Sequence, residues 1–117
     1  MCNPFGGLGL TGGIVDVGGL YDCLLGMYTS QADENILTLY DEIRREKYNN
    51  IINPVSCENI RRLFDQDPDT AMQKDEFLQF VKKAETDVDA QDILNQGAFS
   101  IAYDFTQHYY PMKMNGN

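Results

Sequence analysis

Residues 3–28, NPFGGLGLTGGIVDVGGLYDCLLGMY, decide the fold class of this chain. From about Gly12 onward, apolar side chains recur at spacings of three and four, which predicts a helix ending near Tyr28. The glycines inside this helix each cost roughly 1 kcal/mol relative to alanine, so we expect a neighbour to approach it closely. Because the helix is apolar on nearly every side, it favours burial all round, and we expect four other helices of this size not to provide enough cover. Its apolar stripe consists of Ile14, Val17, Tyr21, Leu24, Leu25 and Tyr28.

The remaining sequence also indicates helices, with neither an alternating strand pattern nor an internal repeat. A second helix is expected from about Glu34 to Asn50, lined by Ile36, Leu39, Tyr40, Ile43 and Tyr48. A kink or break is expected at Asn53–Pro54, because the residue before a proline avoids the helical region. Further helices are expected at about residues 56–64 and 71–84, with a turn at 65–70, and one or two helices at about 89–109. The prediction is an all-α chain of about four or five helices, of a kind more common within a larger fold.

Charge and cysteine usage narrow the classes of function. The formal net charge is −9, which repels nucleic acid phosphates. The basic residues stand among acids at helical spacing and are expected on solvated faces: Arg44, Arg45, Lys47, Arg61 and Arg62. Cys2, Cys23 and Cys57 are too widely spaced for a zinc site and are expected to be free thiols. With no secretory signal and no expected membrane span, the sequence favours a soluble cytoplasmic protein.

The glycine-rich start matches a dinucleotide-binding pattern by letter only. Residues 7–12, GLGLTG, fit G-x-G-x-x-G, but a Rossmann site needs a buried strand before the motif and a second strand after it. Here six residues precede Gly7 and a helix follows. Two readings stay open. The glycines form a tight loop that only turns the chain, or they present unpaired amides at a helix N-terminus to a ligand that carries negative charge.

The same stretch resembles a known family. Residues 3–20, NPFGGLGLTGGIVDVGGL, are similar to the segment that follows the Gly-Asp motif in FAD-dependent aromatic-ring monooxygenases, the group of p-hydroxybenzoate and phenol hydroxylases, and most of all to fungal members. The resemblance continues through residues 40–45 (YDEIRR), 59–68 (NIRRLFDQDP) and 104–107 (DFTQ), and so covers nearly the whole chain.

The resemblance implies a fold, a cofactor and a site. It implies that the chain is the C-terminal helical segment of an α+β flavoprotein, with residues 1–13 as a flavin-facing loop, 14–110 as the helical segment and 111–117 as a loose tail. The complete enzyme would bind FAD, use NAD(P)H as reductant and hydroxylate an aromatic substrate. The cofactor-binding positions implied are Pro4, Gly6, Gly7, Gly9, Leu10 and Thr11, and many members carry Asn in place of Thr11. No catalytic residue is implied, and the partner would be the missing N-terminal FAD-binding portion, without which we expect the chain to be inactive and not to bind FAD.

An alternative function is calcium binding by a small acidic protein. Residues 65–76, DQDPDTAMQKDE, place carboxylates at the first, third, fifth and twelfth positions of an EF-hand loop. Against this, Thr70 stands where the sharp turn needs glycine, and Pro68 stiffens the fourth position. The simpler interpretation is an acidic helix-turn-helix with Asp69 or Thr70 as the N-cap, and no metal site.

Overall fold

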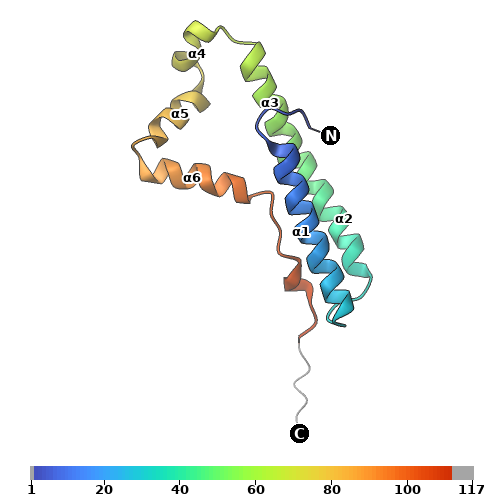
Figure 1. Ribbon diagram of the computed structural model, residues 1–117. Helices are drawn as coiled ribbons and strands as arrows, with labels where there is room; N and C mark the ends of the chain where they lie inside the picture. Colours follow the sequence, from blue (N-terminus) through green and yellow to red (C-terminus); the bar gives the residue numbers. More distant parts are fainter. Residues whose placement is uncertain (1, 112–117) are drawn as a thin grey trace.

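The structure, a computed structural model, describes residues 2–111 and is all-α, as the sequence predicts. The elements in chain order are α1 (Leu8–Tyr28), α2 (Asn35–Lys47), a π-turn (Tyr48–Ile52), α3 (Asn53–Phe64), α4 (Pro68–Lys74), α5 (Glu76–Ala84), α6 (Val88–Phe99) and a 3-10 helix (Phe105–His108). In Figure 1, α1 lies beside a long rod made of α2 and α3, and α4 to α6 form an arm that leads back to the rod. Of the expected tail, residues 112–117 lie outside the described part.

One face of α1 is built from small residues and is buried. Gly12, Gly19, Cys23 and Gly26 repeat along a single helical face, and all four are buried. A Cβ on Gly12 would lie 3.2 Å from Ile52 Cδ1, and a Cβ on Gly19 would lie 2.8 Å from a ring carbon of Phe105. The close neighbour that the glycines predict is therefore present on this face.

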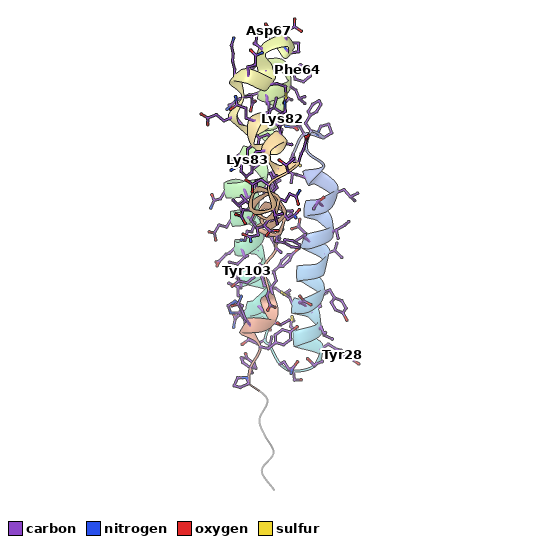
Figure 2. The ribbon with its side chains drawn as sticks, turned by 90° about the vertical axis from the view of Figure 1, so that its left-hand side faces the viewer. Tyr28, Phe64, Asp67, Lys82, Lys83 and Tyr103 are labelled. Atoms are coloured by element: carbon purple, nitrogen blue, oxygen red, sulfur yellow. The ribbon has the colours of Figure 1, made fainter. Side chains whose placement is uncertain are left out.

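The opposite face of α1 is apolar and exposed, so the other described helices do not bury this helix all round, as the sequence predicts. Val17, Tyr21 and Tyr28 keep 69%, 63% and 88% of their surface exposed. The predicted stripe of large side chains is this outer face, whereas the core face is the glycine face. Tyr28 projects outward at one end of α1 in Figure 2. Helical periodicity identifies the stripe of large apolar side chains. Van der Waals contact at close range instead favours the small residues on the inner side of the helix.

The α2–α3 rod continues through the proline without a break. The residues expected inward on α2 are buried or half-buried, which confirms that face. Just before Pro54 the backbone widens into the π-turn, in which the amide of Asn53 donates to the carbonyl of Tyr48. A wider turn accommodates the proline ring and its missing N–H, so helix continues through residues 53–54 without a break, and the π-turn is the irregularity that accompanies the proline.

The expected solvated basic faces are also partly wrong. Arg44 on α2 is 8% exposed, because its side chain reaches between α1 and the segment after α6. Arg62 on α3 is largely buried, because its Nε donates to Asp75 at 2.9 Å and its guanidinium lies 4.3 Å from the centre of the Phe77 ring. These two arginines tie separate elements together, and Arg45 and Arg61 stay exposed as predicted.

The arm consists of more and shorter helices than expected. The segment expected as one helix at residues 71–84 is two, divided at Asp75, whose carboxylate caps α5 by accepting the amides of Phe77 and Leu78. Asp67, rather than Asp69 or Thr70, caps α4, because Pro68 occupies the first helical position where its missing amide does no harm. Residues 89–109 form α6 and the 3-10 helix, within the expected alternative of two helices.

The segment from Tyr103 to Tyr110, here called the C-terminal strap, returns to α1 and α2 and completes the core. Phe105 is fully buried beside Cys23 and Ile36. The Tyr109 hydroxyl donates to the carbonyl of Asp22 on α1, and burial with the nearby Asp22 carboxylate raises the Tyr109 pKa. The strap therefore joins the two ends of the chain over the glycine face of α1.

The shape of the chain is extended. Its radius of gyration is 19.3 Å and its dimensions are 71 × 32 × 17 Å. A compact domain of this length has a radius of gyration of roughly 13 Å. The described helices thus leave much surface uncovered, in agreement with the exposed outer face of α1.

Candidate functional site

The glycine-rich start is held against α3 by hydrogen bonds. The backbone amide of Asn3 donates to Ser56 Oγ at 3.2 Å, and its side-chain Nδ2 donates to the Ser56 carbonyl at 2.8 Å. Ser56 is 1% exposed, so these bonds are anchored in the interior. The Asn59 Nδ2 donates to the Phe5 carbonyl, and a Cβ on Gly6 would lie 2.5 Å from that nitrogen. Gly6 is therefore required both by this contact and by its φ of 102°.

Helix α1 begins four residues earlier than expected, at Leu8 instead of about Gly12. Gly7 adopts a left-handed conformation with φ 67° and starts the helix without a side-chain cap. The close fit of Gly12 against Ile52 stabilises this first turn and outweighs the low helix propensity of its glycines. The predicted loop at residues 1–13 therefore contains the first part of a helix.

The first turn of α1 presents backbone donors to solvent. The amides of Leu8, Gly9 and Leu10 have no acceptor within residues 2–111. They lie at the positive end of the dipole of a helix of 21 residues. The structure thus has the geometry of the second reading of the glycine motif, in which amides are available to a negatively charged or charge-developing group.

The six positions implied as cofactor-binding lie together around this turn. Pro4, Gly6 and Gly7 are in the loop before α1, and Gly9, Leu10 and Thr11 are in its first turn. All six are exposed. Their role in binding a cofactor stays a prediction, and their position leaves them accessible.

Two hollows flank the first turn. One, of about 200 Å³, lies on the side of α6 and is lined by Gly6, Leu8, Thr11, Ile51, Val55, Gly97, Ala98 and Ile101. The other, also of about 200 Å³, lies on the side of the π-turn and is lined by Cys2, Leu8, Gly9, Gly12, Gly13, Asp16, Tyr48 and Ile52. The residues of the π-turn and α6 are not among the site positions predicted from sequence, because they reach the first turn of α1 only through the tertiary fold.

An ion pair between the buried Arg44 and the half-exposed Asp16 lies one to two turns further along α1. Arg44 Nε donates to Asp16 Oδ1 at 2.6 Å, and Arg44 Nη1 donates to the Ile101 carbonyl at 2.5 Å. Arg44 Nη2 is buried and makes no hydrogen bond within the described residues. The Tyr40 hydroxyl donates to the Asp16 carbonyl, and burial together with the Asp16 charge raises the Tyr40 pKa. These contacts fix α1 against α2 and the segment after α6, so they position the first turn.

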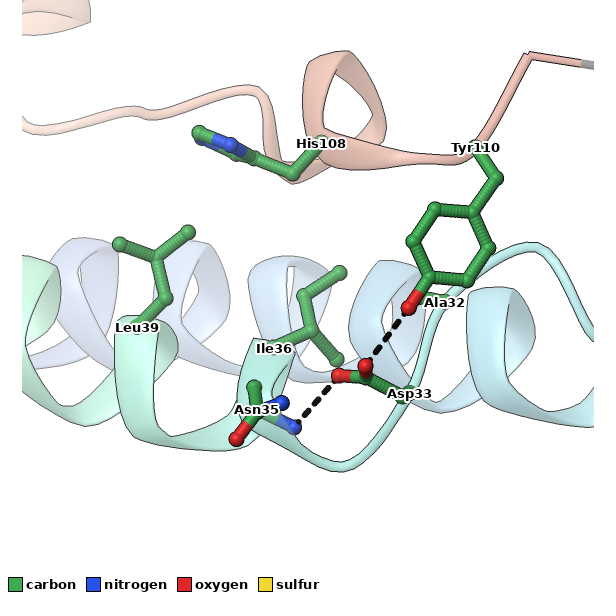
Figure 3. Close-up of a pocket in the computed structure, with 7 residues that line it drawn as sticks. All are labelled: Ala32, Asp33, Asn35, Ile36, Leu39, His108 and Tyr110. Atoms are coloured by element: carbon green, nitrogen blue, oxygen red, sulfur yellow. Dashed lines mark hydrogen bonds between the residues drawn. The ribbon is translucent and has the colours of Figure 1, made fainter.

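A further hollow, of about 360 Å³, lies at the opposite end of α1 (Figure 3). It is lined by Ala32, Asp33, Asn35, Ile36, Leu39, His108 and Tyr110. The Asp33 carboxylate accepts the Tyr110 hydroxyl at 2.6 Å and the Asn35 amide at 2.9 Å, and these bonds lower its pKa. The Asp33 carboxylate is thus occupied by hydrogen bonds within the chain, and His108 in the lining is hydrogen-bonded to the Tyr103 hydroxyl.

The acidic stretch at residues 65–76 does not form a calcium loop. It is divided between the end of α3, helix α4 and the start of α5. Asp67 and Asp75 use their carboxylates to cap helices, and Asp75 also binds Arg62 and Gln66. No group of three or more possible metal-ligating side chains is found within residues 2–111. The calcium alternative is therefore not favoured.

The prediction of free thiols is confirmed, whereas the prediction that no segment could span a membrane is not. Cys2, Cys23 and Cys57 are free, as predicted, and burial beside Asp22 raises the Cys23 pKa.

Contrary to the expectation from sequence, α1 is long and apolar enough, by length and composition alone, to cross a membrane. Core helices of soluble proteins can be equally long and apolar, but they are mostly buried, whereas 17% of this stretch is buried. Asp16 on this helix is paired with Arg44 of α2.

Comparison with known proteins gives one informative relative. The chain is 32% identical over 87 residues to the 6-hydroxy-3-succinoylpyridine 3-monooxygenase of Pseudomonas putida. The match covers 74% of this chain and 22% of the relative, so the chain spans about a fifth of that protein's length. No family model and no solved structure matches. The chain is thus similar to part of a monooxygenase, and this bacterial relative does not address the fungal subgroup.

Proposed function

We propose that this chain is the C-terminal, cofactor-facing portion of a FAD-dependent monooxygenase that hydroxylates an aromatic substrate. The observation that carries the proposal is the exposed first turn of α1, where the amides of Leu8, Gly9 and Leu10 have no acceptor among the described residues. When bound, FAD supplies the redox chemistry, with NAD(P)H as the reductant. The partial likeness to a monooxygenase supports this choice over other ligands that carry negative charge.

The residues of the turn fit the group that the proposal assigns to them. Amides fixed on a helix N-terminus favour a ligand edge on which negative charge develops, because they need no reorganisation when the charge appears. Gly6, Gly7 and Gly9 leave this surface without side chains, so a flat ring can approach the backbone. In this proposal the chain orients the ring and stabilises charge, and it supplies no acid, base or nucleophile.

The partner in the proposal is the remainder of the enzyme. The exposed outer face of α1 is a continuous apolar surface that includes Leu10, Ile14 and Val17, exposed by 77%, 63% and 69%. The extended shape of the chain and its coverage of about a fifth of the relative fit a segment that packs on a larger body. A soluble cytoplasmic enzyme follows from this reading, with the outer face of α1 covered by protein instead of lipid.

Co-expression tests the proposal. The chain would be produced together with the portion of the P. putida monooxygenase that it does not match, and co-purification and bound flavin would be measured by absorbance. We expect flavin with the pair and none with the chain alone. A Gly9→Glu variant places a carboxylate on the first turn and should lose the flavin, whereas Gln91→Glu on α6 adds the same charge elsewhere and should keep it. Failure of the wild-type pair, where the relative's own segment restores flavin, would contradict the proposal.

A further inference from the structure

The two glycines before α1 need a contact that selects one conformation for them. Gly6 has φ 102° and Gly7 has φ 67°, and both lie directly before the first turn of α1. Glycine adopts positive and negative φ about equally well, so these two residues do not fix the direction of the chain by themselves. A contact from α3 does so: Asn59 Nδ2 donates to the Phe5 carbonyl at 3.4 Å and lies where a Cβ on Gly6 would approach it to 2.5 Å.

The side-chain amide of Asn59 has one orientation, because its other end is bound to an arginine. Arg62 Nη1 donates to Asn59 Oδ1 at 3.1 Å. A guanidinium can only donate hydrogen bonds, so the oxygen of the amide has to face Arg62 and its nitrogen has to face the loop. A flipped amide would place two donors together at Arg62 and two acceptors together at the Phe5 carbonyl.

Arg62 is held in turn by the arm. Its Nε donates to Asp75 Oδ2 at 2.9 Å, and the two side chains are largely buried, with 18% and 12% of their surface exposed. Gln66 Nε2 donates to the same Asp75 oxygen at 2.9 Å. Asp75 is the N-cap of α5. Three hydrogen bonds in series therefore connect the start of α5 to the loop before α1, through Asp75, Arg62, Asn59 and Phe5.

We propose that Asn59 is a positioning residue for the first turn of α1, and that Arg62 and Asp75 fix the orientation of its amide. The start of α5 then holds the loop whose glycines shape the cofactor-facing surface, although the two are far apart in the sequence. The inference rests on the proposed function for its consequence, because the position of the turn matters to the cofactor that it receives. The positioning itself concerns the described residues and can be measured without flavin.

Two substitutions at Asn59 separate the two ends of its amide. Asn59→Asp keeps an acceptor for Arg62, but it replaces the donor that faces the Phe5 carbonyl by a second oxygen, and the two oxygens repel each other. Asn59→Leu has a similar shape and loses both hydrogen bonds. Because Arg62 gains a charged partner in Asn59→Asp, we expect this variant to unfold at about the wild-type temperature. The aspartate variant therefore changes the contact with the loop without unfolding the chain.

The position of the turn is measured on the full chain by NMR. We expect both Asn59 variants to shift the backbone amide signals of residues 5–11 and to leave those of α2 unchanged. The Thr11 amide donates to the Gly7 carbonyl at 3.4 Å as the first backbone hydrogen bond of α1. Its hydrogen exchange should become roughly two- to twelve-fold faster, which is the worth of one net hydrogen bond.

Substitutions in the arm test the connection from α5. Arg62→Lys keeps the charge, but a single ammonium cannot donate to Asn59 and Asp75 with the geometry of the guanidinium. Asp75→Asn leaves one oxygen to serve both the α5 cap and Arg62. Both variants should shift the signals of residues 5–11, although neither side chain bonds to the loop. Asp67→Asn is the matched control, because Asp67 caps α4 on the same arm and makes no bond to Arg62.

Flavin binding by the co-expressed pair shows what the positioning does. We expect both Asn59 variants to weaken flavin binding, measured by absorbance, by at least about two-fold, the lower worth of one hydrogen bond. Asp67→Asn should bind flavin as the wild type does. In an Asn59→Leu background, Asp75→Asn should neither shift residues 5–11 further nor weaken flavin binding further, because the connection is already broken.

Four results would overturn the inference. They are unchanged signals at residues 5–11 in the Asn59 variants, equal shifts in Asp67→Asn, unchanged signals in Arg62→Lys and Asp75→Asn, and a turn that moves while the pair binds flavin as tightly as before. If Asn59→Leu does not fold, Asn59→Asp decides. If the Asn59 variants move the turn but the wild-type pair holds no flavin, the positioning stands and the proposed function fails. Flavin held equally by the wild-type and variant pairs rejects the positioning alone.

Discussion

Gly19 and Gly26 of α1 are buried and face the C-terminal strap. The atoms beside them decide whether replacing either glycine by alanine raises or lowers the stability of the fold. A Cβ on Gly26 would lie 2.5, 2.8 and 3.1 Å from ring atoms of Tyr109. A Cβ on Gly19 would lie 2.8 and 3.2 Å from Phe105, which is fully buried. Gly18 is the matched control, because a Cβ there meets nothing within 4 Å. The three positions share one helix and differ in what lies beside them.

The expected magnitude follows from two terms. Alanine in a helix gains roughly 0.5–1 kcal/mol over glycine at each position. Overpacking at Gly19 or Gly26 removes roughly 1–3 kcal/mol, because the rings beside them must shift. Gly18→Ala should therefore be stabilising, and either buried variant should be less stable than Gly18→Ala by roughly 1–3 kcal/mol, since the helix term cancels.

Urea unfolding followed by circular dichroism measures the difference. Removing the Tyr109 side chain should reverse the sign of the effect of Gly26→Ala on stability. In a Tyr109→Ala background the obstacle to Gly26→Ala is gone, so the same substitution should become stabilising like Gly18→Ala. If Gly26→Ala stabilises the wild-type chain as much as Gly18→Ala does, the strap does not pack on the glycine face and this reasoning is refuted.

Four other predictions concern the ion pair, acid stability, the outer face and calcium. Asp16→Ala should destabilise the chain more than Arg44→Met, as seen in thermal unfolding, because it leaves the buried guanidinium without its carboxylate; equal losses would count against this. Hydrogen bonds from Gln66 and Leu78 and the Arg62 charge outweigh burial and lower the Asp75 pKa. This carboxylate therefore stabilises the fold above an unfolded pKa of about 3.9, and the contribution is lost as pH falls through the lower folded value. Asp75→Asn should be less stable at neutral pH and lose less on acidification. Val17→Lys should change unfolding of the chain by less than about 0.5 kcal/mol, since Val17 is 69% exposed, yet block co-purification with the remainder of the monooxygenase. Millimolar calcium should not shift the melting temperature, whereas a ligand at a hundred times its dissociation constant adds about 2.7 kcal/mol.

Local pattern was sufficient for the fold class and for most helices, and it failed where distant residues decide. The inner side of α2 was predictable because its apolar and charged faces differ. Arg44 reads as a solvated residue in the same pattern, and only the approach of Asp16 and Ile101 buries it. At Pro54 the local rule predicts a kink or break, but a π-turn before the proline accommodates the ring and the helix continues.

The candidate site divides in the same way. The glycine motif located the exposed turn, because glycines before a helix and free amides at its start are both local features. The hollow beside that turn could not be predicted, since Val55, Gly97 and Ile101 approach it from three separate parts of the chain. Gly97 was the one signal available: a glycine in a helical segment that no turn explains.

Hydropathy alone does not predict which face of α1 is buried and which is exposed. Both of its faces are apolar, so the usual contrast between a wet and a dry side is missing, and what differs is the size of the side chains. Small residues allow the strap and α2 to approach closely, which makes the inner face specific to this chain. Large residues on the outer face offer area without close contact among the described residues. A helix divided in this manner is suited to lie between two bodies, and its first turn, with free amides, stands at the end where both would meet. On that basis the exposed apolar face and the exposed turn are parts of one proposal: the surface that would receive the rest of the enzyme also brings the turn to its cofactor.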